Sequence, residues 1–219
     1  MKKIISISLA TALLACSCGG KKQEQNADSM AAVTANNNGN PTDALNNAMN
    51  AMNGGGDASQ KKWADRKAKG DTLAMPYADL MKYLPASLDG YTVSEPATGT
   101  TTNMTGMSLT STEVHFKKGN DEVKISLIDY NAAASLYQSA TAIWAMGLSI
   151  DSPEESAKGV KMDNDIAGWE DYHKKTREVT LTLGIGYRFW LEIDADNQDG
   201  SDWVKSVANN MDLKKLASM

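Results

Sequence analysis

The stretch EVTLTLGIGYRFWLEID, residues 178–194, decides the fold class of this 219-residue chain. Apolar residues alternate with other residues on both sides of the central GIG, with Val179, Leu181 and Leu183 before it and Tyr187, Phe189, Leu191 and Ile193 after it. Alternation with a period of two is typical of a strand that buries one face, and glycines between two such runs are typical of a turn. The stretch therefore predicts a β-hairpin.

The segments on either side of this hairpin carry further strand and helix patterns. Strands are predicted at 91–94, 109–117 and 122–129, and a second hairpin pairs the strand around 160–162 with 166–175; residues 97–107, rich in Gly, Thr and Asn, are predicted as a loop. Helices are predicted at 77–84, at 132–147 with Leu136 on the apolar stripe, and onwards from a cap at Ser201. Strands joined by hairpins form an antiparallel sheet, and amphipathic helices pack on it. We therefore expect one α+β domain over residues 71–219.

The junction LPASLDGY, residues 84–91, resembles the passage from the first helix to the first strand in PsbP-like proteins. The order of the predicted elements over 71–219 is similar to that family as well. The resemblance implies an α/β/α sandwich, and it implies a binding or assembly protein rather than an enzyme. A fold alone does not determine a function, so the side chains have to be considered separately.

The chain begins with the pattern of a secretory signal peptide over residues 1–15. Two lysines precede an apolar run that is shorter than the roughly 20 residues needed to span a bilayer. The run ends in Leu13-Leu14-Ala15-Cys16, which resembles the lipobox of bacterial lipoproteins. That resemblance implies cleavage before Cys16 and attachment of acyl chains, palmitate among them, to this residue. Cys18, in a second register, is the alternative attachment site, and an ordinary signal peptide is the other alternative.

The lipoprotein resemblance implies a location in the cell envelope, with the protein held at a membrane by its lipid. Ser17 stands where inner-membrane lipoproteins of many Gram-negative bacteria carry Asp, which favours the outer membrane over the inner one. The chain has two cysteines, Cys16 and Cys18, so the domain that follows them holds no disulfide, although exported proteins are free to form them. The stability of the domain must come from packing alone.

Residues 16–60 are polar and rich in Asn, Gly, Ala and Gln, a composition typical of a flexible, disordered tether. Within this tether, residues 42–52 have helical spacing and are either a partner-binding helix or a transient helical turn. Residues 61–70 hold five Lys or Arg against one Asp, a net charge of +4. They form a basic linker, which is either a solvated helix or a segment attracted to a phospholipid surface.

The domain over 71–219 is acidic, with 13 Lys or Arg against 22 Asp or Glu and hence a net charge of −9. This charge argues against binding nucleic acid, which requires positive charges opposite the phosphates. His115 and His173 fall in separate predicted strands and the domain has no cysteine, so no metal site and no cofactor are predicted. The sequence also lacks a Gly-x-Ser-x-Gly elbow and a phosphate-binding loop, so we expect no catalytic activity.

The acidic run EIDADNQDGSD, residues 192–202, has two interpretations. Asp194, Asp196 and Asp199 could supply oxygens to calcium, but Gln198 and Asp199 stand one residue out of register with the pattern D-x-D-x-[DN]-G. A polar turn that leaves a strand and caps the next helix explains the same residues. The capping turn is the main interpretation and calcium is the alternative.

Trp190 lies between Arg188 and Glu192, on the strand face opposite Phe189 and Leu191. If a helix covers this face, Trp190 belongs to the core; if none does, Arg188, Trp190 and Glu192 mark a binding surface. We therefore expect a non-catalytic, membrane-anchored protein that binds another envelope protein or a small apolar ligand. A structural envelope component without a ligand is the first alternative, and a hydrolase is the second.

Overall fold

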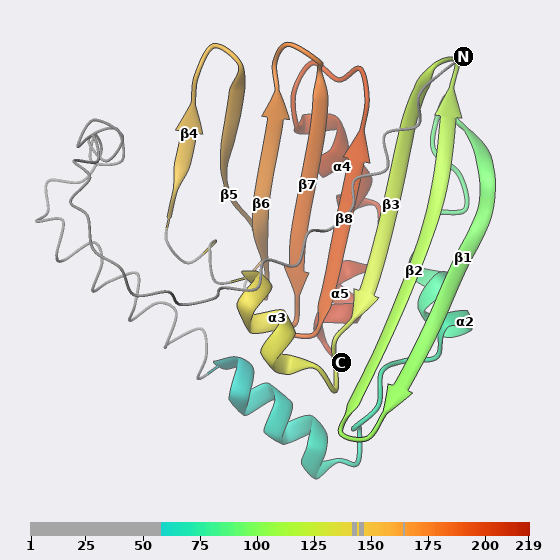
Figure 1. The fold of residues 1–219 in the computed structure, drawn as a ribbon, viewed down its shortest axis with the longest axis vertical. Coiled ribbons are helices and arrows are strands. Elements are labelled where there is room, and N and C mark those ends of the chain that lie inside the picture. Colours follow the sequence, from blue (N-terminus) through green and yellow to red (C-terminus); the bar gives the residue numbers. More distant parts are fainter. Residues whose placement is uncertain (1–57, 142–143, 145–146, 164) are drawn as a thin grey trace, which may run out of the picture. The chain divides into compact units, whose positions relative to one another are not determined.

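The computed structural model describes residues 58–141, 144, 147–163 and 165–219. Cys16, Cys18, residues 42–52 and nearly all of the predicted tether lie outside the described residues. In the described part, eight antiparallel strands form one sheet in the order β1-β2-β3-β8-β7-β6-β5-β4 (Figure 1). The strands are β1 (Thr92–Met104), β2 (Met107–Lys118), β3 (Asp121–Asp129), β4 (Ser149–Asp151), β5 (Glu155–Asp163), β6 (Ile166–His173), β7 (Glu178–Ile185) and β8 (Phe189–Ala195).

The sheet consists of two runs of hairpins that meet at its centre. β1, β2 and β3 pair in succession, and so do β4 to β8. The two runs are joined where β3 pairs with β8, with Ile125 opposite Ile193 and Leu127 opposite Leu191. The predicted α+β fold, an antiparallel sheet built of hairpins with helices packed on it, is confirmed.

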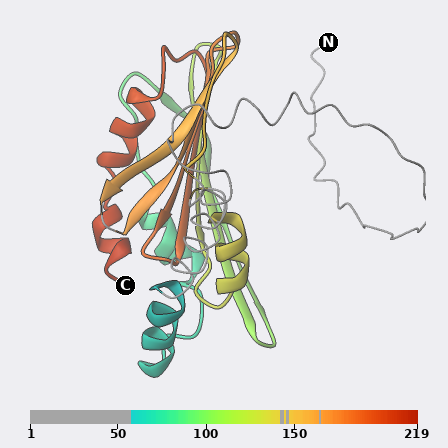
Figure 2. The same ribbon diagram turned by 90° about the vertical axis from the view of Figure 1, so that its left-hand side faces the viewer.

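Helices lie on both sides of the sheet, which Figure 2 shows edge-on. One face carries α2 (Tyr77–Leu80), η3 (Met81–Tyr83), α4 (Asp202–Asn209) and α5 (Leu213–Ala217), and the other carries α3 (Ala134–Thr141). The described helices include none with the length and apolarity that a membrane-spanning segment requires.

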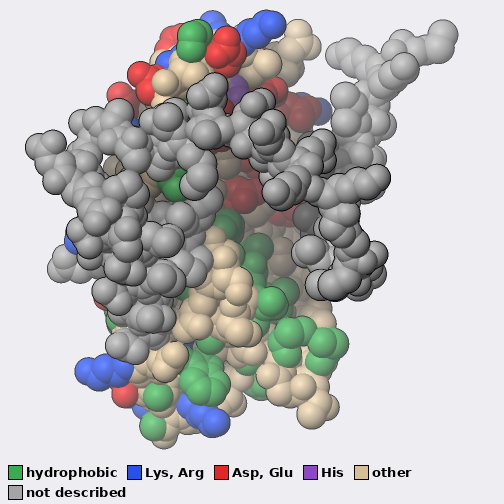
Figure 3. Space-filling model, turned by 60° about the vertical axis from the view of Figure 1, so that its left-hand side comes forward, with side chains coloured by type: hydrophobic (Ala, Val, Ile, Leu, Met, Phe, Trp, Pro, Cys, Tyr) green, Lys and Arg blue, Asp and Glu red, His purple; other side chains and the backbone are tan. Residues whose placement is uncertain are grey.

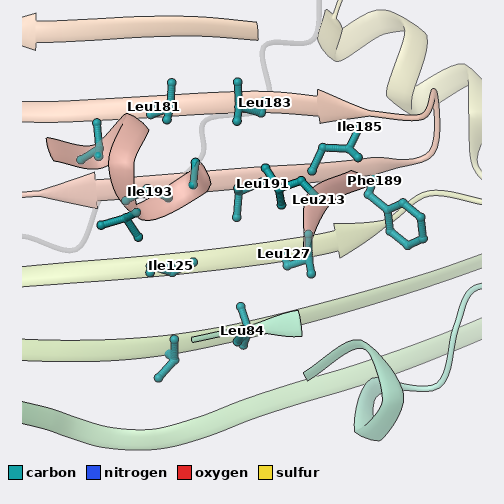
Figure 4. Packing of buried hydrophobic residues seen from close by; sticks show 14 of the residues in the cluster. Leu84, Ile125, Leu127, Leu181, Leu183, Ile185, Phe189, Leu191, Ile193 and Leu213 are labelled. Carbon is teal, nitrogen blue, oxygen red and sulfur yellow. The ribbon is translucent and has the colours of Figure 1, made fainter. Parts of the chain in front are cut away.

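The hydrophobic core fills the space between the sheet and α2, η3, α4 and α5. Leu181, Leu183, Leu191 and Ile193 of the central hairpin are fully buried in it (Figure 4). Leu80 and Leu216 reach the same cluster from the helical layer. The alternation that predicted the hairpin therefore corresponds to the face of the sheet that the helices cover, because successive side chains of a strand point to opposite faces.

The region 97–107 was expected to be a loop, and this expectation is wrong. It forms the end of β1, a turn at Thr105-Gly106, and the start of β2. Its threonines are β-branched and favour strands. The hydroxyls of Thr101 and Thr110, which face each other across the pair, hydrogen-bond at 3.0 Å. Of the glycines that indicated a loop, Gly106 stands in the turn with a φ of 79°, whereas Gly99 lies within β1, where a Cβ would meet Tyr77 and Thr112 at 3.0 Å.

Four other details of local structure differ from the expectations. β7 continues through Gly184 and Ile185, so the turn starts at Gly186, and Tyr187 stands in it with a φ of 56°. In α3 it is Tyr137, not Leu136, that is buried against the sheet. Strand β4 was not predicted. Two helices, α4 and α5, follow Ser201, whose side chain makes no capping hydrogen bond.

Residues 58–68 are helical, so the segment predicted as a basic linker belongs in large part to a helix. This helix is attached to the domain by polar contacts. Lys62 Nζ binds Asp165 Oδ2 at 2.8 Å, and Arg66 Nε donates to Asn131 Oδ1 at 2.8 Å. Arg66 is 5% exposed.

Candidate functional site

The face of the sheet opposite the core is polar over its five central strands, and we call it the polar face. Most of its side chains are half-buried. They are Glu113 and His115 of β2, Lys124 and Ser126 of β3, Trp190, Glu192 and Asp194 of β8, Thr180 and Thr182 of β7, and Trp169 and Asp171 of β6.

Strand register aligns these side chains in rows across the sheet. One row runs from His115 through Lys124, Asp194 and Thr180 to Asp171. The adjacent row runs from Glu113 through Ser126, Glu192 and Thr182 to Trp169. Neighbours within a row have Cβ atoms about 5 Å apart, close enough for their side chains to interact.

The carboxylates of the polar face outnumber its lysines. Lys124 Nζ lies 3.4 Å from Asp194 Oδ2 and 3.8 Å from Glu192 Oε1, and Thr180 donates to Asp194 at 2.8 Å. Burial raises the pKa of Glu192, and the charge of Asp194 raises it further, whereas Lys124 and a hydrogen bond with Trp190 lower it. The ionised form of Glu192 is therefore only partly compensated by its neighbours.

Asp171 is also incompletely paired. Its Oδ2 lies 3.8 Å from His173 Nε2, and its Oδ1 is buried without a hydrogen-bond partner among the described residues. A buried carboxylate oxygen without a donor is costly, so the ionised form of Asp171 is incompletely satisfied by the described residues.

Trp190 lies at the border between a covered and an open part of this face. Its ring stacks on Trp144 with a centroid distance of 5.1 Å and an interplanar angle of 30°. Gly184, beside it on β7, has no side chain because a Cβ there would stand 2.3 Å from Tyr137 Oη of α3. Trp190 was expected either in the core or on an open binding surface. The structure places it between these two, since its side chain is half-buried.

Arg188 was expected beside Trp190 and Glu192 on a binding surface, and the structure corrects this. The residue precedes the first residue of β8, so strand alternation does not apply to it. Its side chain is buried, donating to Asp129 from Nε at 2.9 Å and from Nη2 at 2.7 Å, and to Asp71 from Nη1 at 2.7 Å. Arg188 holds the fold together rather than contacting a ligand.

The three carboxylates considered for calcium have separate partners. Asp194 is bound by Thr180, Asp196 accepts the amide of Glu122 at 3.2 Å, and Asp199 pairs with Arg177 at 2.6 Å. The described residues contain no group of three or more His, Cys, Asp or Glu placed to hold a metal ion.

The two histidines lie far apart on the sheet, with three strands between β2 and β6. His115 is on β2, with Nε2 3.7 Å from Glu113, and His173 ends β6. The structure therefore does not bring them to one site.

A shallow groove of about 590 Å³ lies on the helical side, between residues 82–89 and α4. Leu88, Trp203 and Met211 contribute apolar surface, while Asp89, Asn210 and Asp212 make part of its lining polar. The ring of Trp203 is held by Tyr91 at a centroid distance of 5.3 Å. The groove is open, and it lacks the aligned rows of half-buried carboxylates that the polar face carries, so the polar face is the stronger candidate site.

Comparisons of the chain with protein-family models, with curated proteins and with solved structures gave no match. The resemblances to bacterial lipoproteins and to PsbP-like proteins stay predictions from the sequence.

Proposed function

We propose that this protein is a lipid-anchored protein of the cell envelope, with the outer membrane favoured, whose domain binds a basic segment of another envelope protein through the polar face. The observation that carries the proposal is the set of half-buried carboxylates on Glu113, Asp171, Glu192 and Asp194 beside two tryptophans on one sheet face. A partner that supplies Lys or Arg would satisfy these carboxylates.

The chemistry of this face fits a cationic polypeptide better than a small apolar ligand. Guanidinium and ammonium groups bind carboxylates and also the faces of tryptophan rings, and Trp169 and Trp190 stand beside the acidic rows. Interfaces of this type gain specificity from complementary charge. Lys124 pairs with Glu192 and Asp194 across strands, and each histidine lies near a carboxylate of its own strand. Nucleophilic catalysis would instead require a nucleophile beside a base.

The anchor gives the first prediction. Cys16→Ser should abolish incorporation of palmitate, because the thioether that joins the lipid to the protein needs this thiol. The protein should then move from the membrane fraction to the soluble fraction, since each buried CH₂ of the lost acyl chains contributes roughly 0.8 kcal/mol. The matched control, Cys18→Ser, should keep both the label and the membrane location. Labelling that persists in Cys16→Ser and disappears in Cys18→Ser would move the attachment site to Cys18.

The polar face gives the second prediction, with an arginine-rich peptide of about ten residues as the probe. Combined Glu113→Gln, Asp171→Asn and Glu192→Gln should weaken binding about tenfold. This estimate assigns roughly 0.5 kcal/mol of binding free energy to each of the half-exposed charge pairs that the variant loses. Isothermal titration calorimetry at two salt concentrations measures the affinity. The expected loss is larger at low salt because screening is weaker there.

The control for this experiment removes the same number of charges elsewhere. Asp89→Asn, Glu154→Gln and Asp199→Asn are exposed and lie off the polar face. They should change the affinity less than twofold. Equal losses in the two triple variants would mean that the peptide senses only net charge, and the proposed binding face would be wrong.

A further inference from the structure

One end of the domain gathers exposed apolar side chains together with lysines, and we call it the basic end. Trp63, Leu73, Met104 and Leu136 are 38%, 61%, 58% and 49% exposed. They come from the helix at 58–68, the segment after it, the β1–β2 turn and α3, which lie at the lower end of Figure 1. Lys61, Lys67 and Lys69 are exposed on and just after the same helix.

The helix at 58–68 presents a fixed side outward because its other side is bound to the domain. Arg66, besides its bond to Asn131, donates from Nη2 to the carbonyl of Tyr187 at 3.3 Å, and Ser59 accepts from Gln138 of α3 at 3.3 Å. Trp63 and Lys67 are left on the exposed side, with the ammonium of Lys67 5.1 Å from the centre of the Trp63 ring.

Hydrogen bonds also bring Leu73 and the β1–β2 turn to this end. Asn131, which accepts from Arg66, donates to the carbonyl of Leu73 at 2.9 Å. The next residue, Ala74, donates its amide to Ser108 Oγ at 2.8 Å, directly after the turn that carries Met104. The apolar side chains therefore belong to segments that hydrogen bonds connect into one region.

The charge of this end is opposite to that of the rest of the domain. Residues 61–70 have a net charge of +4 and residues 71–219 a net charge of −9. Because Lys62 and Arg66 bind the domain, the exposed side of the helix carries Lys61, Lys67 and Lys69 against Asp65, a net charge of +2. Asp71, at the border, is paired with Arg188. In Figure 3, hydrophobic side chains lie beside Lys or Arg side chains at the lower end, with an acidic side chain among them. Asp and Glu side chains lie mainly in the upper half, whose top also carries Lys or Arg side chains. An anionic surface would therefore attract this end and repel the remainder.

We propose that the basic end rests on a bilayer that contains anionic phospholipids. Lysines gain from the negative surface potential of such a bilayer, and tryptophan is enriched at the level of the head groups. The exposed apolar side chains could enter the boundary between head groups and acyl chains, while the lysines between them contact the head groups. The inference rests on the proposed function in one respect. The proposed lipid on Cys16 would hold the domain at the membrane, and the helix at 58–68, the part of the described domain nearest to Cys16 in the sequence, belongs to the basic end.

This orientation would point the strands away from the bilayer. Val93 and Met104 lie at opposite ends of β1, eleven residues and thus about 35 Å apart. Both side chains are exposed, at 48% and 58%. A probe at position 104 should therefore meet lipid while an equivalent probe at position 93 stays in water.

The test uses the full-length lipidated chain with Cys18→Ser, reconstituted in vesicles of phosphatidylcholine alone or with about one third phosphatidylglycerol. Met104→Cys and, as the matched control, Val93→Cys are each labelled with a polarity-sensitive fluorophore. In anionic vesicles, we expect a blue shift and quenching by nitroxide-labelled lipids at position 104 and neither at position 93. In phosphatidylcholine alone, the quenching at position 104 should fall at least twofold.

Lysine variants separate the basic end from net charge. Each Lys near an anionic surface is worth about fivefold in affinity, so combined Lys61→Gln, Lys67→Gln and Lys69→Gln should reduce quenching at position 104 to the level at position 93. Combined Lys117→Gln, Lys118→Gln and Lys175→Gln, which removes three exposed lysines elsewhere, should not.

Two results would overturn the inference. One is equal quenching at positions 93 and 104 in protein that floats with both kinds of vesicle. The other is a blue shift at position 104 that needs no vesicles and grows with protein concentration, which would assign the basic end to a second copy of the chain. Flotation of the protein with vesicles is measured separately. A protein that no longer floats would contradict the proposed lipid anchor, whereas it would say nothing about the orientation of the domain.

Discussion

Replacing Asp129 by Asn should lower the free energy of unfolding by about 3 kcal/mol, the lower end of the cost of breaking a buried ion pair, because Arg188 keeps its second partner, Asp71. Asp129 is fully buried, and its carboxylate accepts two hydrogen bonds from Arg188. It also accepts the amides of Met75 at 2.8 Å and Asn131 at 2.9 Å. The single substitution therefore removes one of the two negative charges opposite Arg188 and disturbs the attachment of both neighbouring segments.

Urea unfolding of the two proteins measures this difference, provided that the slope of the transition is unchanged. Asp199→Asn is the matched control, because it breaks a pair with Arg177 that is equally short but in which Asp199 is 94% exposed. An exposed pair contributes about 0.2–1 kcal/mol, so the control should lose no more than that. Equal, small losses in the two variants would mean that the ion pair of Arg188 does not stabilise the fold.

The fold class was predictable because the central strands bury one side of the sheet. Val179, Leu181 and Leu183 alternate with residues that lie on the polar face, and this pattern is visible without knowledge of any partner strand. β1 lacks the signal, since it is exposed along most of its length and contains threonines where a buried strand would carry Val or Ile. Its assignment depends on pairing with β2, which local composition does not reveal.

The candidate site was predictable only in part. Trp190 and Glu192 follow from alternation along one strand, and the structure places both on the polar face. Trp169 and Asp171 were missed because their place beside Glu192 and Asp194 depends on the register of β6 with β7 and of β7 with β8. Arg188 was assigned to the wrong environment because the turn starts at Gly186, two residues later than the GIG of residues 184–186 indicated, so that Arg188 belongs to the turn and not to the strand.

Among the described glycines, Gly168 of β6 leaves the least room for a side chain. A Cβ at this position would stand 1.8 Å from the carbonyl oxygen of Thr182 and 2.8 Å from Leu183 Cα. Both are backbone atoms of β7, so no side-chain rotation can relieve the contact. Gly168→Ala would force β6 and β7 apart, and these strands connect the central hairpin to β5 and β4.

We therefore expect Gly168→Ala to lower the free energy of unfolding by at least roughly 3 kcal/mol, the upper end of the usual effect of overpacking. A loss of this size should populate unfolded protein at 37 °C. Gly159→Ala on β5 is the matched control, because its Cβ would meet nothing nearer than the carbonyl oxygen of Gly168 at 4.0 Å. That change should be neutral or stabilise by about 0.4–1 kcal/mol, since alanine restricts the unfolded chain. Thermal unfolding followed by circular dichroism distinguishes the two. Similar melting temperatures for Gly168→Ala and Gly159→Ala would show that β6 and β7 do not approach as closely as their register requires.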